Sequence, residues 1–271
     1  MSLAASVCTI PQLLGRYGNL NVESYQRPYS WGEAQIERLF VDHFIPLVDG
    51  TDIAFKGDPF VGTVVLLPKS GRDKAAEIID GQQRTATLTM TLAHALRLMS
   101  GHGSPSLRSS FEGILTGPGN EPWLSLRDQD RVSYSAIMNP QLTVDQVHKK
   151  ISADRHAAMV ASEGTPGRKP AVIRRAIYDV LDLIDDQIQD YLEVAASKGG
   201  LSKDAALVRL VEFIRDGLRV VAVEVDSPGQ GLAVFEALNT AGLPLTLEQL
   251  LKNCLMRVFN SPDQHERIDA R

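Results

Sequence analysis

Two neighbouring apolar runs followed directly by a helical run constrain the fold of this chain most. The first run, "FVGTVVLL" from Phe60 to Leu67, is joined to the second, "AAEIID", by the polar turn "KSGRDK". Short runs rich in Val, Ile and Leu that are bounded by turn residues are typical of buried β-strands. We therefore predict a β-hairpin and, after Asp80, a helix that runs to about Met99.

The rest of the chain predicts several helices and one more strand. A capping-box pattern from Ser30 to Glu33 predicts a helix whose apolar face extends from Ile36 to Leu47. The other predicted elements are a long amphipathic helix over 171–198, a helix near 203–215, a strand over 218–226, a helix ending near Asn239 and a last helix capped at Thr246.

These elements indicate the fold class α+β, a small mixed sheet with a helical lobe. We expect the core in residues 1–100, a helical region in 101–215, a strand and helices that return to the core in 216–260, and a polar tail in 261–271.

Composition excludes some classes of protein. The chain has 271 residues and a formal net charge of −5, which gives no global attraction to nucleic acid but allows a local basic groove. Cys8 and Cys254 lack metal-ligand spacing and are typical of reduced cytosolic thiols. No signal-peptide pattern is present, and no apolar run approaches the roughly 20 residues of a membrane span. We therefore expect a cytoplasmic protein without membrane contact.

The junction "IIDGQQRTATL", where the second strand meets the helix, is the first candidate site. Asp80 and Gln83 form a D-x-x-Q version of the capping box, which would make this a purely structural helix start. That interpretation leaves Gly81, Gln82 and Arg84 unexplained. A helix N-terminus with a glycine for close approach and an arginine one turn on is also typical of an anion site. The pattern alone leaves both interpretations open.

The segment "SYQRPYSW" is the second candidate. Its aromatic residues, Tyr25, Tyr29 and Trp31, surround Gln26 and Arg27. Rings beside a glutamine and an arginine suit stacking on bases and binding of phosphate. A packed corner between a strand and a helix is the alternative.

The segment "FEALNTAGLPLTLEQLLKN" is the third candidate. It is typical of a helix-turn-helix corner, and such a corner does not require Lys252 and Asn253, so we consider a phosphate contact there. The histidines show no pairing at ligand spacing, and no metal site is expected.

The three segments occur together, in this order, in one family. "YQRPYSW", then "FVGTVVLL" with "IIDGQQRTATL", then "VFEALNTAGLPLTLEQLLKN" resemble the N-terminal domain of GmrSD-type modification-dependent restriction proteins. The resemblance covers about residues 10–259, and residues 100–200 carry no matching motif. Among family members, it is strongest to the SspE-like proteins of phosphorothioate-based antiphage defence.

The resemblance implies a fold, an activity and partners. It implies a ParB/sulfiredoxin-like core that binds and hydrolyses GTP or another nucleoside triphosphate, with Mg²⁺ as a candidate cofactor. It further implies recognition of modified DNA, here phosphorothioate DNA, and coupling to an HNH-type nuclease domain in the same full-length chain or in a partner. No HNH-like cluster is visible here, so we expect no DNA cleavage from this chain alone.

The resemblance also assigns roles by position. The residues implied in catalysis are Asp80, Gln82, Gln83 and Arg84, and those implied in nucleotide binding are Gly81, Arg84 and Thr85. The residues implied in DNA binding are Tyr25, Gln26, Arg27, Pro28, Lys252 and Asn253. Two other functions stay open: a DNA-binding module without nucleotide turnover, and a ParB-like DNA nickase.

Overall fold

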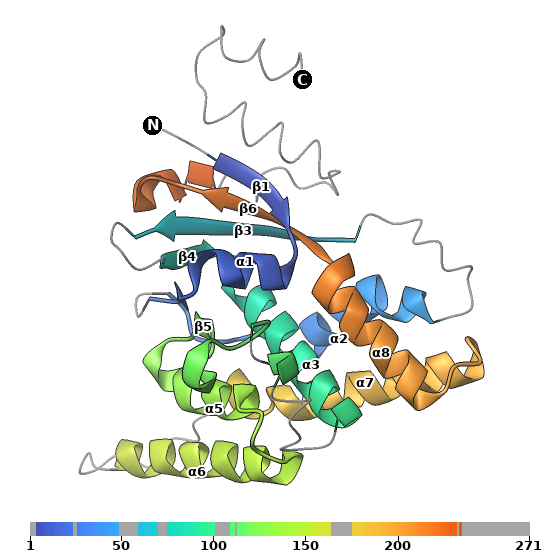
Figure 1. Cartoon of the computed structure of the whole chain (residues 1–271). Helices are drawn as coiled ribbons and strands as arrows, with labels where there is room; N and C mark the ends of the chain where they lie inside the picture. Colours follow the sequence, from blue (N-terminus) through green and yellow to red (C-terminus); the bar gives the residue numbers. More distant parts are fainter. Residues whose placement is uncertain are drawn as a thin grey trace, which may run out of the picture.

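The structure is a computed structural model of the chain. It describes residues 4–23, 26–48, 59–69, 75–100, 109–111, 113–163, 175–231 and 233–234. A mixed β-sheet lies at one end of the molecule, and most of the helices lie below it in the view of Figure 1. This arrangement confirms the α+β class.

The sheet has six strands in the order β1-β6-β3-β4-β2-β5. Their bounds are β1 Ala4–Cys8, β2 Leu20–Asn21, β3 Phe60–Pro68, β4 Ala76–Asp80, β5 Leu124–Ser125 and β6 Arg219–Glu224. Strands β3 and β4 are antiparallel, which confirms the predicted hairpin, and the predicted strand over 218–226 is β6. Strand β2 is parallel to both of its neighbours, β4 and β5, so the sheet is mixed.

The central strands β3 and β6 are buried on both faces. Along β3, Val64 belongs to the main core while Val65 belongs to a smaller apolar cluster on the opposite face. Along β6, Val220 likewise belongs to the main core and Val221 to the smaller cluster. Strands without a solvent-facing side read as continuous apolar runs, which is why the sequence pattern identified these two so clearly.

The α-helices are α1 Ile10–Tyr17, α2 Glu33–His43, α3 Gln82–Ser100, α5 Asp128–Met138, α6 Val144–Glu163, α7 Val180–Ser197 and α8 Lys203–Glu212. Short helical turns lie at η1 Ile45–Leu47, η2 Pro118–Asn120, η3 Ala176–Tyr178 and η4 Phe213–Gly217. None of the helices within the described ranges is both long enough and apolar enough to cross a membrane.

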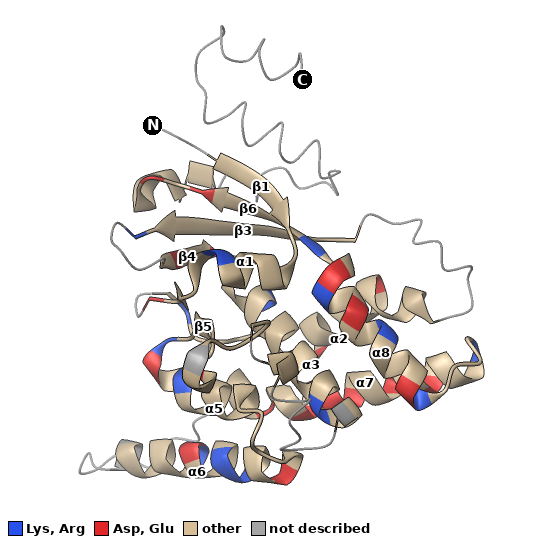
Figure 2. Cartoon of the chain, viewed as in Figure 1, with Lys and Arg blue, Asp and Glu red and all other residues tan. Residues whose placement is uncertain are grey.

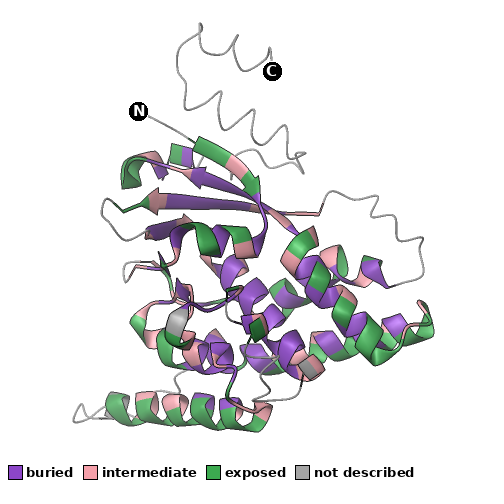
Figure 3. Cartoon of the chain, viewed as in Figure 1, coloured by how far each residue is buried: buried purple, intermediate pink, exposed green. Residues whose placement is uncertain are grey.

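Helix α3 is the central helix and is enclosed by its neighbours, as its buried colouring in Figure 3 illustrates. It contacts α1, α5, α7 and α8. Its first half carries four fully buried threonines, Thr85, Thr87, Thr89 and Thr91. Each hydroxyl donates to a main-chain carbonyl within the helix or at its start, and two also bond a tyrosine hydroxyl. These bonds satisfy the polar groups, so the helix can be buried without a desolvation penalty.

Two predicted helix starts are wrong. Helix α2 begins at Glu33 with Gly32 before it, and the Gln35 side chain accepts a hydrogen bond from the Gly32 N–H, so Ser30 is not the cap. The physical reason is that the main chain of Ser30 bonds elsewhere, as described below. The long amphipathic helix begins at Val180, after η3, instead of at residue 171. The two helices predicted after residue 226 lie almost wholly outside the described residues.

Candidate functional site

Gly81 forms the sharp junction between β4 and α3. Its φ of 90° lies in the left-handed region that favours glycine, and an added Cβ would lie 2.8 Å from the carbonyl oxygen of Thr63. The Gly81 carbonyl accepts the first main-chain bond of the helix, from the Thr85 N–H at 3.0 Å. The residue that precedes the helix is therefore Gly81. Of the two interpretations that the sequence left open, the capping box of Asp80 with Gln83 is wrong.

Gln82 and Gln83 bond the segment 26–30 instead of capping their own helix. The Gln83 side-chain oxygen accepts from the Ser30 N–H at 2.7 Å, and its nitrogen donates to the Pro28 carbonyl at 3.0 Å. The Gln82 side-chain nitrogen donates to the Arg27 carbonyl at 3.3 Å. A carboxamide carries an acceptor oxygen and a donor nitrogen, so the single Gln83 side chain can make both bonds. The two glutamines thus fix the main chain of the "YQRPYSW" segment against the start of α3.

Arg84 lies over β3 in a space that Gly62 leaves open. Its Nη1 donates to the Thr63 carbonyl at 3.2 Å, and a Cβ at Gly62 would lie 2.4 Å from the same Nη1. Burial lowers the pKa of the Arg84 guanidinium, and the nearby Asp80 carboxylate acts in the opposite direction. Because Gly62 also has a φ of 123°, both space and backbone geometry require a glycine there.

These residues enclose a pocket of about 110 Å³. It is lined by Arg27 and Trp31 from one segment and by Asp80, Gly81, Gln82, Gln83 and Arg84 from the other. The first N–H groups of a helix have no acceptor within the helix and give its N-terminus a partial positive charge. A helix start together with two arginines can hold an anion. The overall charge is negative, and Figure 2 shows acidic and basic residues interspersed along α6 and α8, while α7 carries acidic residues without Lys or Arg.

The start of α5 holds the other side of the 26–30 segment. Arg127 Nη1 donates to the Gln26 carbonyl at 2.6 Å, and the Asp130 carboxylate accepts from the Tyr29 N–H at 2.8 Å. Asp130 is completely buried; burial raises the pKa of its carboxyl, and the Tyr29 N–H opposes this shift. The sequence analysis missed both residues, because "LRDQD" is indistinguishable from an ordinary acidic helix start.

The structure brings most of the sequence-predicted residues together. Asp80, Gly81, Gln82, Gln83, Arg84 and Arg27 line one pocket. Thr85 is fully buried, and its hydroxyl donates to the Gly81 carbonyl. Gln26 donates from its side-chain nitrogen to the Ile78 carbonyl on β4, so this nitrogen already has a partner within the protein. Tyr25, Lys252 and Asn253 lie outside the described residues. Within the described ranges, no group of three or more potential metal-binding side chains is found.

Comparison with known protein families identifies the family of the chain. The family described as "GmrSD restriction endonuclease, N-terminal domain" matches residues 10–256, which is most of the chain. The chain belongs to the GmrSD family. Its GmrSD N-terminal domain makes it a restriction-system protein of the kind that defends against phage, with DNA as the target and a nuclease domain as the functional partner. No curated protein matches the sequence.

Proposed function

We propose that this GmrSD N-terminal domain hydrolyses a nucleoside triphosphate, GTP in the first instance, and senses phosphorothioate DNA. It passes the result to a nuclease domain of the HNH type. The observation that carries the proposal is the set of hydrogen bonds by which Gln82 and Gln83, in the first turn of α3, hold the main chain of residues 27–30. One turn of helix thereby connects a phosphate-sized pocket to the segment expected to contact DNA.

The size and charge of the pocket support binding of phosphate groups. Sites for whole ligands usually measure about 300–1,000 Å³. At about 110 Å³, this pocket fits the phosphate end of a nucleotide, whose base and sugar would lie outside it. Arg84 and the main-chain N–H groups at the start of α3 would bind the phosphate oxygens.

The hydrogen bonds also suggest how the catalytic roles divide. The carboxamides of Gln82 and Gln83 are already engaged with residues 27–30. Asp80 is the only acidic residue that lines the pocket, and among the described residues its carboxylate has no hydrogen-bond or ion-pair partner. We therefore propose that the Asp80 carboxylate orients the water molecule that attacks the phosphate.

Mg²⁺ fits this donor set. In nucleotide sites it is usually held by one or two carboxylates together with substrate phosphates. Asp80 would supply the carboxylate, and the ion would offset the charge of the phosphates.

Arg27 is the residue best placed to contact a DNA backbone. It is exposed, it lines the phosphate pocket, and its main chain is held by Gln82. Beside it, the Pro28 ring and the Trp31 indole offer apolar surface. Sulfur is larger and softer than the oxygen it replaces in a phosphorothioate, so a cation next to such surface could favour the modified backbone.

The proposal is tested by phosphate release from GTP, ATP, CTP and UTP. Wild type, Arg84→Ala and the control Arg38→Ala are compared, each with and without phosphorothioate DNA. Arg38 is exposed on α2, and among the described residues its one ion-pair partner is Asp42. Its loss should therefore leave phosphate release unchanged. We expect release that is lost in Arg84→Ala and that responds to modified DNA.

The second candidate is a DNA reader without nucleotide turnover. The exposed position of Arg27 favours it independently of the phosphate pocket. If no nucleotide releases phosphate while DNA binding stays intact, the DNA reader replaces the nucleoside triphosphatase as the proposed function. Nicking of DNA that depends on Arg84 would instead favour a nuclease.

A further inference from the structure

A second pocket lies at the edge of the sheet, beside β2 and β5, in a region where the sequence showed no motif. Strands β2 and β5 are parallel and form the edge of the sheet, with Leu20 opposite Leu124 and Asn21 opposite Ser125. Side chains alternate between the two faces of a strand. Leu20 and Leu124 are buried in the core, so Asn21 and Ser125 face away from it.

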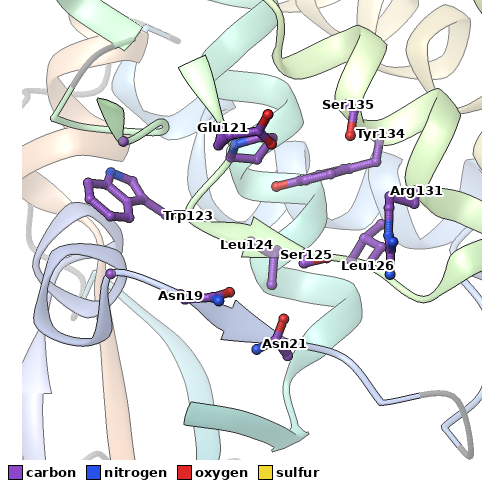
Figure 4. Close-up of a pocket in the computed structure, with 13 residues that line it drawn as sticks. Asn19, Asn21, Glu121, Trp123, Leu124, Ser125, Leu126, Arg131, Tyr134 and Ser135 are labelled. Atoms are coloured by element: carbon purple, nitrogen blue, oxygen red, sulfur yellow. The ribbon is translucent and has the colours of Figure 1, made fainter. Parts of the chain in front are cut away.

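The pocket measures about 480 Å³, within the range of roughly 300–1,000 Å³ that is usual for ligand sites. Figure 4 shows its parts: Asn19 and Asn21 come from β2 and the residue before it, Trp123 and Ser125 come from β5 and its approach, and Arg131, Tyr134 and Ser135 project from α5. Elements from three parts of the chain thus converge on one hollow.

Several polar groups of the pocket are free to bind a ligand. Among the described residues, no hydrogen-bond partner is found for the side chains of Asn19, Asn21, Ser125 and Ser135. The indole N–H of Trp123 is buried and also has no partner there. A buried donor without a partner costs free energy, which a ligand acceptor could recover.

The chemistry of the lining fits a planar, hydrogen-bonding ring. Each asparagine amide offers both a donor and an acceptor, the pattern that reads the edge of a base. The Trp123 indole offers an aromatic surface for stacking. Arg131 and Glu121 bring opposite charges at exposed positions, and Arg131 also pairs with Asp128, so the pocket is poorly suited to a highly charged anion.

The pocket lies next to the candidate site. Leu126 lines both this pocket and a small cavity that is bounded by Arg27, Gln82 and Gln83. Strand β2 also precedes the 26–30 segment in the chain. A DNA strand held at Arg27 would therefore have the pocket beside it.

We propose that this pocket receives a single nucleobase turned out of the bound DNA. The proposal rests on the DNA-sensing part of the proposed function and adds a second point of recognition to it, on the base as well as on the backbone. Enzymes that inspect or modify bases extrude them in this way, and the cost is lowest where the base is mismatched.

The two tryptophans of the chain allow a direct test. Trp31 lines the phosphate pocket and Trp123 lines the base pocket, so in Trp31→Phe the remaining emission reports base occupancy alone. The probe is a phosphorothioate duplex with one mismatched pair next to the modification, and fluorescence anisotropy of a dye on the same duplex reports binding. We expect saturable quenching of Trp123, stronger for the mismatched than for the fully paired duplex.

Two variants in the Trp31→Phe background make the test specific. Asn21→Leu removes an edge-reading amide, and Ser135→Met fills the pocket from α5. We expect each to weaken binding of the mismatched duplex about 5-fold or more, since one good base contact is worth roughly 1–3 kcal/mol. The control, Ser152→Met at an exposed site on α6, should leave binding unchanged. Thermal unfolding checks that each variant folds.

The outcomes separate this inference from the proposed function. Bound duplex with unchanged Trp123 emission, or full affinity in both variants, overturns the base pocket and leaves backbone sensing intact. Quenching of Trp123 without any phosphate release supports the base pocket and contradicts the proposed hydrolysis of a nucleoside triphosphate. Absence of DNA binding by the wild-type protein, measured by anisotropy, overturns both the sensing and the base pocket. The phosphate-release assay then tests the hydrolysis separately.

Discussion

The side-chain oxygen of Gln83 accepts a hydrogen bond from the main-chain N–H of Ser30 at 2.7 Å. The two residues belong to the two motifs that sequence reasoning treated as separate candidates. The bond joins the start of α3, which lines the proposed phosphate pocket, to the segment expected to contact DNA. A displacement of either one must therefore change the position of the other.

Gln83→Ala should loosen the 26–30 segment. It removes the acceptor of the Ser30 N–H and the donor to the Pro28 carbonyl, so we expect the free energy of unfolding to fall by about 1–3 kcal/mol. Faster amide exchange at Ser30 measures the local effect. The matched control is Gln35→Ala, which removes a comparable but exposed bond to Gly32 and should cost less. Equal losses in the two variants would contradict the prediction.

Gly62→Ala should displace the Arg84 guanidinium. The new methyl would overlap Nη1, and the φ of 123° is strained for alanine, so we expect a loss of about 1–3 kcal/mol in stability. Phosphate release should fall towards the level of Arg84→Ala. Gly15→Ala is the control, because its methyl meets open space within α1 and alanine there should stabilise the helix by about 0.5–1 kcal/mol. Unchanged phosphate release in Gly62→Ala would show that the activity does not depend on the position of the Arg84 guanidinium over Gly62.

Arg27→Ala should weaken DNA binding by removing a contact with the phosphate backbone of the DNA, without changing sequence preference. If Arg27 contacts one phosphate, the slope of log affinity against log salt should become shallower by about one, equally for all sequences. Titrations at several salt concentrations measure it. An unchanged slope would place the DNA contact elsewhere in the chain.

Asp130→Asn should change how stability depends on pH. Burial raises the pKa of the Asp130 carboxyl above its ordinary value of 3.8, so the folded protein binds this proton more tightly than the unfolded chain does. The stability contributed by this group is therefore present at low pH and is lost as pH rises from about 3.8 through the raised pKa.

Asparagine keeps an acceptor for the Tyr29 N–H but carries no charge. Urea unfolding at a series of pH values should show Asp130→Asn gaining stability relative to wild type as pH rises. A constant difference between the two proteins across that range would be inconsistent with a raised pKa.

The parts of the fold that the sequence predicted are those with the strongest local signals. Strands β3, β4 and β6 are apolar runs, and α3 follows a turn that only glycine allows, so pattern and structure agree. Strands β2 and β5 are two residues long and are recognisable only through their partners in the sheet. No periodicity can be read from two residues, which is why the sheet edge and its pocket were missed.

The candidate site was predicted in its residues but not in its internal bonds. The junction 80–84 and the segment 26–30 were both identified, yet the one structural role considered for Gln83 was that of a cap for its own helix. A D-x-x-Q pattern describes a local bond, and here a distant main-chain donor, Ser30, takes the side chain instead. Arg127 and Asp130 were missed for the same reason, since their partners lie far away in the sequence.

The large sequence separation between the partners of these bonds has a consequence for folding during synthesis. Ser30 and Gln83 are 53 positions apart, and Gln26 and Arg127 are 101 apart. Contacts between distant residues require the closure of large loops and form slowly. During synthesis, a nascent chain that has not yet reached Asp130 leaves the Tyr29 N–H without its acceptor. The segment expected to read DNA therefore gains its final shape only after the ribosome has completed the start of α5, well after the junction at residues 80–84 has emerged.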